Sequence, residues 1–176
     1  MIKIEKPTNE DIKEIQQVFY ETWLATYPNK DAGITSEDIK ERFRNRLSQQ
    51  AIQKITNEIS DESGDKLFLV AKEDGIIVGV CKVIKKEAFN QLEAIYVLPN
   101  HQRKGIGRML WNKAIEFFGD KNDIVVQVAT YNTQAIDFYK KLGFIDYGKR
   151  FTVEKHRMPI SGKFIPEMEL VIRATK

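Results

Sequence analysis

The sequence predicts an α/β domain built on a mixed sheet. Short runs rich in β-branched residues alternate with longer segments whose apolar residues recur every three or four positions. Asp74 and Gly75 join two of the β-rich runs as a hairpin. A basic turn with two glycines, residues 102–107, lies between a β-rich run and a helical one. The 176 residues are enough for one domain, which we place at residues 1–176.

The N-terminal third predicts one short strand, residues 2–4, followed by helices. Thr8 and Asp11 form a capping-box pattern, in which a side chain at each position bonds the other's backbone N–H. Apolar residues then recur at helical spacing, and this helix ends near Ala25.

The capping pattern repeats at Thr35 and Asp38. Apolar residues follow at every fourth position over residues 39–59, with a possible break near Gln49. We therefore expect two or three helices before the chain turns to strands.

Strands dominate the middle of the chain. A three-strand meander is expected at residues 67–71, 76–84 and 91–97, and a helix at residues 105–118. Residues 124–128 are apolar enough for a central buried strand.

The C-terminal third predicts one more helix and two closing strands. The helix covers residues 132–142, and Gly143 can end it in the left-handed conformation. Residues 144–153 and 167–173 are the expected strands.

Composition excludes several classes of protein. No apolar run approaches the roughly 20 residues that span a bilayer, and the N-terminus lacks a signal-peptide core, so we expect a cytoplasmic protein without membrane partners. The net charge of +3 is scattered, which argues against a nucleic-acid partner. His101 and His156 lack metal-ligand spacing, and we expect no metal.

The turn at residues 102–107 has the chemistry of an anion site. Backbone N–H groups at a helix start lack intrahelical partners and carry the positive end of the helix dipole. Gly105 and Gly107 let that backbone approach a phosphate closely, while Arg103, Lys104 and Arg108 add positive charge. A plain tight turn is the alternative interpretation, because a lone Gly-x-Gly is a weak signal.

Two other phosphate motifs are excluded. No Gly-Lys-Ser/Thr follows the turn, so it is not a Walker A loop. The third glycine of a dinucleotide fingerprint would fall at position 110, which is Leu110.

Two motifs in the correct order resemble the GNAT superfamily of acyl-CoA-dependent N-acyltransferases. Residues 102–107, Gln-Arg-Lys-Gly-Ile-Gly, match its Gln/Arg-x-x-Gly-x-Gly/Ala signature. Residues 132–144 match its Asn-x-x-Ala-x-x-Phe-Tyr-x-x-Leu-Gly-Phe segment. The resemblance implies a mixed, mostly antiparallel sheet of six to seven strands with about four helices on both faces. It also implies acetyl-CoA as co-substrate.

In this family the loop cradles the pyrophosphate of coenzyme A, and the strand before it pairs with the pantetheine arm. The resemblance therefore implies a set of cofactor-binding residues on that strand, the loop and the later helix. They are Ile95, Tyr96, Val97, Gln102, Arg103, Lys104, Gly105, Ile106, Gly107, Arg108, Asn132, Ala135 and Tyr139.

Tyr139 is the candidate acid for the departing thiolate. A phenol has a pKa near 10, close enough to that of a thiol to share a proton with it. On a helix, Asn132, Ala135 and Tyr139 share one face, so all three can meet the cofactor. The alternative for Tyr139 is a core aromatic beside Phe138.

Glu93 is the candidate base for the amine. It is expected to share a strand face with Ile95 and Val97, where a carboxylate is unusual unless it is partnered or functional. Its position resembles a glutamate of the spermidine/spermine N-acetyltransferases of the superfamily. A salt-bridged glutamate, with ordered water as the base, is the alternative.

The acceptor is expected to be a small amine, and a polyamine is the first candidate. Trp23 and Tyr27 resemble a stretch of bacterial polyamine-acetyltransferase-like members and can hold an ammonium by cation–π contact, or Trp23 belongs to the core. Glu21, Glu87 and Glu93 can supply carboxylates.

Two other activities remain open. One is transfer to a protein or peptide amine, and the other is a non-catalytic CoA-binding regulator. Tyr139 and Asn132 argue against the regulator, because a pure binder needs only the loop. A homodimer is possible by analogy with the family.

Overall fold

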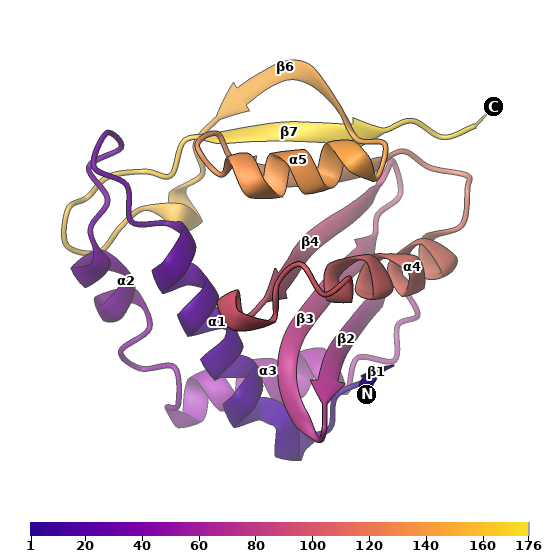
Figure 1. Cartoon of the computed structure of the whole chain (residues 1–176), viewed down its shortest axis with the longest axis horizontal. Coiled ribbons are helices and arrows are strands. Elements are labelled where there is room, and N and C mark those ends of the chain that lie inside the picture. The colour runs from indigo at the N-terminus through magenta and orange to yellow at the C-terminus, as the bar shows by residue number, and fades with distance from the viewer. Residues whose placement is uncertain (176) are drawn as a thin grey trace.

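The computed structural model describes residues 1–175. One sheet runs through it in the order β1-β2-β3-β4-β5-β7-β6 (Figure 1). The strands are β1 (Ile2–Glu5), β2 (Lys66–Glu73), β3 (Ile76–Lys85), β4 (Asn90–Val97), β5 (Ile124–Ala129), β6 (Ile145–Phe151) and β7 (Glu167–Ile172). The α-helices are α1 (Ile12–Thr26), α2 (Ser36–Arg42), α3 (Gln49–Ile59), α4 (Ile106–Phe118) and α5 (Thr133–Lys141).

The sheet is mixed and mostly antiparallel, as predicted. Within residues 1–175 only β4 and β5 pair in parallel, and every other neighbouring pair of strands is antiparallel. The helical region between β1 and β2 holds three α-helices, so the described residues contain five rather than about four. No helix among residues 1–175 is long and apolar enough to cross a membrane.

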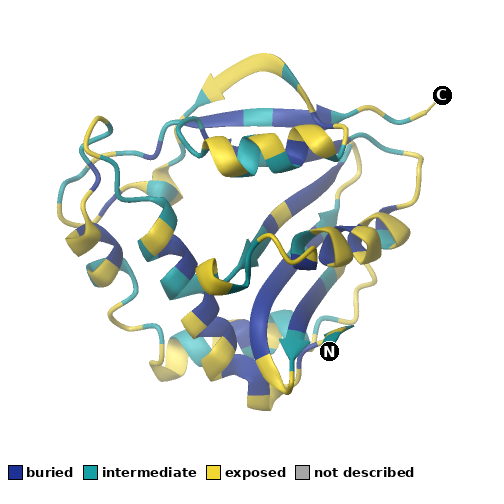
Figure 2. Cartoon of the chain, viewed as in Figure 1, coloured by how far each residue is buried: buried dark blue, intermediate teal, exposed yellow. Residues whose placement is uncertain are grey.

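Helices cover both faces of the sheet because side chains alternate along each strand. On β2, Leu69 packs in the cluster that contains Leu110 and Trp111 of α4. Its neighbour Val70 packs instead with Ile15 of α1. Figure 2 shows the resulting burial of the inner strands, whereas the edge strand β6 is largely exposed.

Local sequence signals fix several boundaries. Asp74 and Gly75 both have positive φ, 52° and 89°, as a two-residue hairpin turn requires. Gly143 has a φ of 101° after the end of α5, as predicted. The break between α2 and α3 also exists: α2 ends at Arg42, and the Ser48 hydroxyl caps α3 by accepting from Ala51 N–H.

The sheet opens between β4 and β5. The two strands pair only from Asn90 to Leu92 on one side and from Ile124 to Val126 on the other. β4 continues to Val97 along β3, while β5 continues to Ala129 along β7. The β4 edge beyond Leu92 therefore has no neighbouring strand, and its backbone groups can pair with a ligand.

A β-bulge changes the orientation of Glu93. Lys82 of β3 pairs with Ala94 and Val83 pairs with Leu92, so Glu93 is left without a partner. The prediction that Glu93 shares a face with Ile95 and Val97 is therefore wrong. The extra residue shifts the alternation, and Glu93 lies with Ala94 on the opposite face.

Candidate active site

A cleft of about 910 Å³ lies beside the open edge of β4. Its walls are β4, the turn that follows, the first turn of α4, and α5. The lining residues predicted from the sequence are Ile95, Val97, Gln102, Arg103, Gly105, Ile106, Gly107, Arg108, Asn132, Ala135 and Tyr139. Two motifs far apart in the sequence thus form one cavity.

The turn is tied to both of its neighbours through Gln102. The Gln102 side-chain amide donates to the Val97 carbonyl at 3.0 Å, and Gln134 of α5 donates to the Gln102 side chain at 2.7 Å. Gly105 is the N-cap of α4 with a φ of 81°. The residues that follow it line the cleft, and their N–H groups have no intrahelical acceptors, which suits a pyrophosphate.

Basic side chains complete the anion site, although not all the predicted ones. Arg103, Arg108 and Lys141 line the cleft. Lys104 does not: its ammonium lies 3.4 Å from Glu73, whose carboxylate also contacts His101 Nδ1 at 2.6 Å. The sequence motifs do not indicate Lys141, and its place in the last turn of α5 is the signal that points to it.

The side chain of Tyr96 also lies outside this cleft. Along β4 it faces the opposite side from Ile95 and Val97, so only its backbone belongs to the edge that can meet a cofactor.

α5 presents its predicted face to the cleft. Asn132 caps the helix, its side-chain oxygen accepting from Ala135 N–H at 3.1 Å. Tyr139 is only 6% exposed, and its ring packs against Phe138 and Phe144 at 5.5 and 5.6 Å between centroids. Among residues 1–175 its hydroxyl has no hydrogen-bond partner, so it is available to a ligand in the cleft.

Burial raises the pKa of the Tyr139 phenol above its ordinary value, and the neighbouring Tyr96 raises it further. The phenol therefore keeps its proton at neutral pH. A thiol held in the same place would lose solvation too, so its pKa would rise in the same direction.

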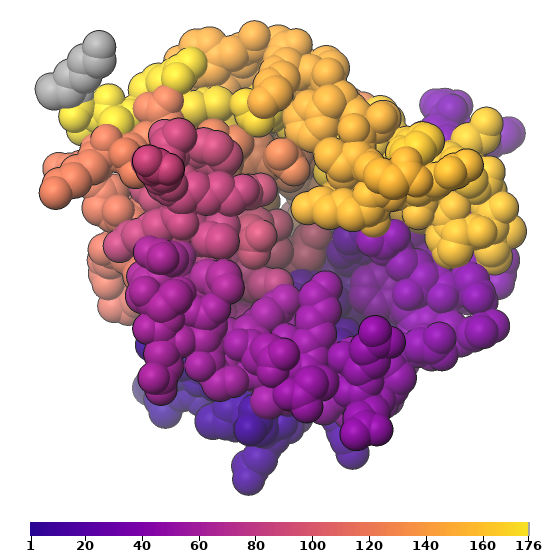
Figure 3. Space-filling model, turned by 180° about the vertical axis from the view of Figure 1, so that it is seen from behind, coloured from indigo at the N-terminus to yellow at the C-terminus, as the bar shows by residue number. Residues whose placement is uncertain are grey.

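A second cavity, of about 1130 Å³, lies on the other face of the same stretch of β4, and we call it the groove. Its walls come from α1, α2, α3, strands β2 to β4, and residues 155 and 156. Figure 3 shows the hollow from behind, between the purple helical region, the magenta strands and the orange-yellow C-terminal segment. Glu93, Ala94 and Tyr96 line it. Cleft and groove therefore reach β4 from opposite faces.

Aromatic side chains form the inner end of the groove. Trp23 packs on Tyr27 at 4.3 Å between centroids, and the hydroxyls of Tyr27 and Tyr96 lie 3.3 Å apart. Trp23 is packed with Ile34 and Ile39 in a core cluster, which agrees with the core interpretation, and it also lines the groove, whereas Tyr27 does not.

The charges of the groove differ from those expected. Of the three carboxylates named from the sequence, Glu93 lines the groove, whereas Glu21 and Glu87 do not. Glu58 is a second carboxylate in its lining. The basic side chains that line it are Arg42, Arg46, Lys54, Lys66, Lys82 and Lys155. Among the described residues, His, Cys, Asp and Glu form no cluster of three that could hold a metal ion.

Comparisons with known proteins agree with this geometry. The family model of the Acetyltransferase (GNAT) family matches residues 14–144. The spermidine N(1)-acetyltransferase of Thermoplasma acidophilum is 32% identical over 81% of this chain and 88% of its own length. The crystal structure of the PaiA N-acetyltransferase of Thermoplasma acidophilum in complex with coenzyme A has a TM-score of 0.73 at 26% identity, over 96% of this chain and 98% of the other. Salmonella typhimurium YncA with acetyl-CoA has a TM-score of 0.64 at 18% identity, over 100% and 95% of the two chains, and supports the fold. The chain belongs to the GNAT family of N-acetyltransferases.

Proposed function

We propose that this protein transfers the acetyl group of acetyl-CoA to a small primary amine. One observation carries the proposal: the cleft and the groove meet β4 from opposite faces where the strand has lost its β5 neighbour. The cleft suits CoA because it joins an anion site at the start of α4 to a free strand edge. The groove then receives the amine.

The reaction needs a proton acceptor, a proton donor and a carbonyl held between them. The amine nitrogen attacks the thioester carbon, the C–S bond breaks, and the thiolate takes the Tyr139 proton. The nitrogen gives one of its two protons to the Tyr139 phenolate, which restores the phenol, and the amide keeps the other. Glu93 lies on the groove side and stays a candidate for the base that first deprotonates the amine.

CoA binding is tested through Gly105, with Gly64 as a matched control. Both glycines have nearly equal positive φ, 81° and 79°, and an added Cβ meets no atom within 4 Å at either. Alanine should therefore cost each variant about 1 kcal/mol of stability through backbone strain. Only Gly105→Ala should also weaken CoA binding, because its Cβ enters the approach to the phosphate.

Thermal unfolding with and without CoA measures this difference. At 100 times its dissociation constant CoA should stabilise the wild type and Gly64→Ala by about 2.7 kcal/mol. If CoA raised the Tm of both variants equally, the turn would not be part of the CoA-binding site. Gly107 is a poorer choice, since its Cβ would press on the Phe138 ring at 3.2 Å and disturb the packing of α4 against α5.

A polyamine is the first candidate acceptor. The support is the spermidine N(1)-acetyltransferase relative at 32% identity, together with the carboxylates Glu58 and Glu93 in the groove. Incubation with acetyl-CoA, with thiol release as the readout, should show faster acetylation of spermidine than of peptide N-termini. Faster turnover of peptides would instead support a protein acetyltransferase, and no thiol release with any amine would support a CoA-binding regulator.

A second candidate is an amine that also carries an anionic group. Six basic side chains line the groove against two carboxylates, and Glu58 already pairs with Lys82 at 2.7 Å. Added salt separates the candidates, because screening weakens attraction and repulsion alike. The KM of an anionic amine should rise with ionic strength, whereas the KM of a polyamine should fall if basic side chains dominate its approach.

A further inference from the structure

His156, which lines the groove, contacts the buried carboxylate of Glu167. Glu167, the first residue of β7, is only 5% exposed, and its Oε1 lies 3.0 Å from His156 Nδ1. Its other oxygen, Oε2, is buried and has no hydrogen-bond partner among residues 1–175. A buried carboxylate is costly unless it is paired, so this arrangement calls for a role beyond packing.

The carboxylate fixes the state of the imidazole. A neutral histidine carries one N–H, and a carboxylate on Nδ1 favours the tautomer with the proton there. Nε2 then carries the lone pair and can accept a proton. His156 lines the groove, so the imidazole is within reach of a molecule that enters it.

Aromatic contacts connect His156 to the opening of the sheet. Its ring meets Trp23 edge-on at 5.8 Å between centroids, and Trp23 packs on Tyr27, whose hydroxyl lies 3.3 Å from that of Tyr96 on β4. Burial raises the pKa of both tyrosines, so they stay protonated and do not compete with the imidazole for a proton.

Two cations lie beside His156, while the carboxylate of Glu154, two residues earlier, is exposed and pairs with Arg157. Arg42 of α2 lies over the Trp23 ring at 4.8 Å and donates to the Lys155 carbonyl at 2.6 Å. Lys155 precedes His156 in the chain and also lines the groove. Neither can accept a proton from an ammonium at neutral pH, which leaves His156 with Glu167 as the basic unit at this end.

We propose that His156, held by Glu167, is the proton acceptor for the amine substrate. This inference rests on the proposed acetyltransferase function. The ammonium of the substrate gives one proton to Nε2, the free amine attacks the thioester carbon, and the proton on Nε2 is later released to solvent. His156 is then a catalytic residue and Glu167 a positioning residue.

Glu93 is the competing base, and its surroundings differ. It lies at the bulge of β4, is exposed, and is three residues before Tyr96. At about 3.3 Å per residue it lies roughly 10 Å along the strand from Tyr96, toward the end where β4 and β5 still pair. Glu93 is thus the first residue of the open stretch, whereas His156 contacts the aromatic cluster that contains Tyr96, further along that stretch. Tyr96 is also the neighbour that raises the pKa of Tyr139, the proposed acid.

The test is the pH profile of kcat/KM for the best amine found. The wild type should show an acidic limb that reports protonation of its base, separate from the limb of the amine itself. His156→Gln should lose the limb of the base and about 10²–10⁴-fold in kcat/KM at neutral pH. Glu167→Gln should lose less activity than His156→Gln, and the loss should appear in kcat with little change in the amine KM, because the amide oxygen can still accept from Nδ1 but holds the imidazole less firmly.

Three controls make the result decisive. Stabilisation by CoA should be unchanged in both variants, which separates a failure of this inference from a failure of the proposed function. Added imidazole should restore part of the activity of His156→Ala. Glu154→Gln, which removes an exposed neighbouring carboxylate, should behave as wild type. A wild-type pH profile in His156→Gln, or loss of the limb in Glu93→Gln alone, would overturn the assignment.

Discussion

Replacing Tyr139 by phenylalanine is expected to lower kcat by about 10²–10⁴-fold, the usual contribution of a general acid. The substitution removes one hydroxyl and keeps the ring that packs between Phe138 and Phe144. The thiolate would then have to take its proton from water. Because the lost contact forms mainly in the transition state, the KM for acetyl-CoA should change little.

Tyr131→Phe is a matched control for this substitution. The Tyr131 hydroxyl donates to the Tyr27 carbonyl at 2.9 Å, so its loss should cost about 1 kcal/mol of stability and little activity. The Tyr139 hydroxyl has no partner among the described residues, so Tyr139→Phe should unfold like the wild type. A near-normal kcat in Tyr139→Phe, with no burst of product in the wild type, would exclude the residue as the acid.

Burial of Tyr139 also predicts the shape of the alkaline side of the pH profile. Because burial raises the pKa of the phenol above its ordinary value, the acid stays protonated through neutral pH and beyond. Loss of activity below about pH 10 should therefore come from other groups. Measurement of kcat at saturating amine up to that pH checks this.

The parts of the site that could be predicted depend on contacts between residues near each other in sequence. Asn132 caps α5 three residues from Ala135, and Gly143 ends the helix one turn after Tyr139. Gly105 likewise opens α4 with its own backbone conformation. Such signals need no knowledge of the rest of the fold, so the cleft side of the site followed from two motifs.

The groove side could not be predicted because long-range contacts build it. The bulge at Glu93 comes from the pairing of β4 with β3, and a strict alternation of faces cannot show it. The sequence predicts Lys104 at the phosphate, but the lysine pairs with Glu73 instead. Glu73 lies 31 residues earlier, so this contact cannot be seen in the local pattern. His156 and Glu167 come together only when the loop between β6 and β7 has folded back.

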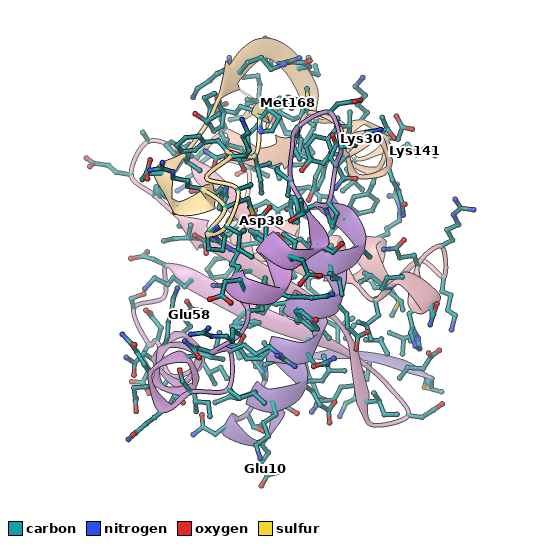
Figure 4. The ribbon with its side chains drawn as sticks, turned by 90° about the vertical axis from the view of Figure 1, so that its left-hand side faces the viewer. Glu10, Lys30, Asp38, Glu58, Lys141 and Met168 are labelled. Atoms are coloured by element: carbon teal, nitrogen blue, oxygen red, sulfur yellow. The ribbon has the colours of Figure 1, made fainter. Side chains whose placement is uncertain are left out.

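Asp38→Ala is expected to lower the free energy of unfolding, and this is the second largest effect that we expect. Asp38 is fully buried at the start of α2 and accepts four hydrogen bonds. One oxygen binds the N–H and hydroxyl of Thr35, each at 2.9 Å, and the other binds the N–H groups of Ile160 and Ser161 at 3.1 and 2.8 Å. Figure 4 shows Asp38 between α2 and the C-terminal loop.

Alanine would remove the shared acceptor of all four donors, which lie in a partly buried place. The loss should be about 2–4 kcal/mol, because hydrogen bonds to a charged group contribute about 1.5–3 kcal/mol each and are not additive, and the Tm should fall by roughly 4–16 °C. Because the same loop carries His156, catalysis should fall as well. Urea unfolding gives the free energy, and a loss below about 1 kcal/mol would mean that water replaces the carboxylate without cost.

The pH dependence of stability separates the charge of Asp38 from its shape. Burial alone would raise the pKa of this carboxyl, but the hydrogen bonds from Ser161 and Thr35 outweigh it and lower the pKa to about 2. The folded value is below the unfolded value near 3.9, so the carboxylate stabilises the fold above pH 4 and this contribution, about 2 kcal/mol, is lost between pH 4 and pH 2. Asp38→Asn keeps the oxygen for Ile160 and Ser161 and cannot titrate. At pH 7 its free energy of unfolding should lie between those of Asp38→Ala and the wild type. At pH 2 its free energy of unfolding should be closer to that of the wild type than at pH 7. If the free energies of unfolding of the wild type and Asp38→Asn differed by the same amount from pH 2 to pH 7, the charge of Asp38 would have no part in anchoring the loop.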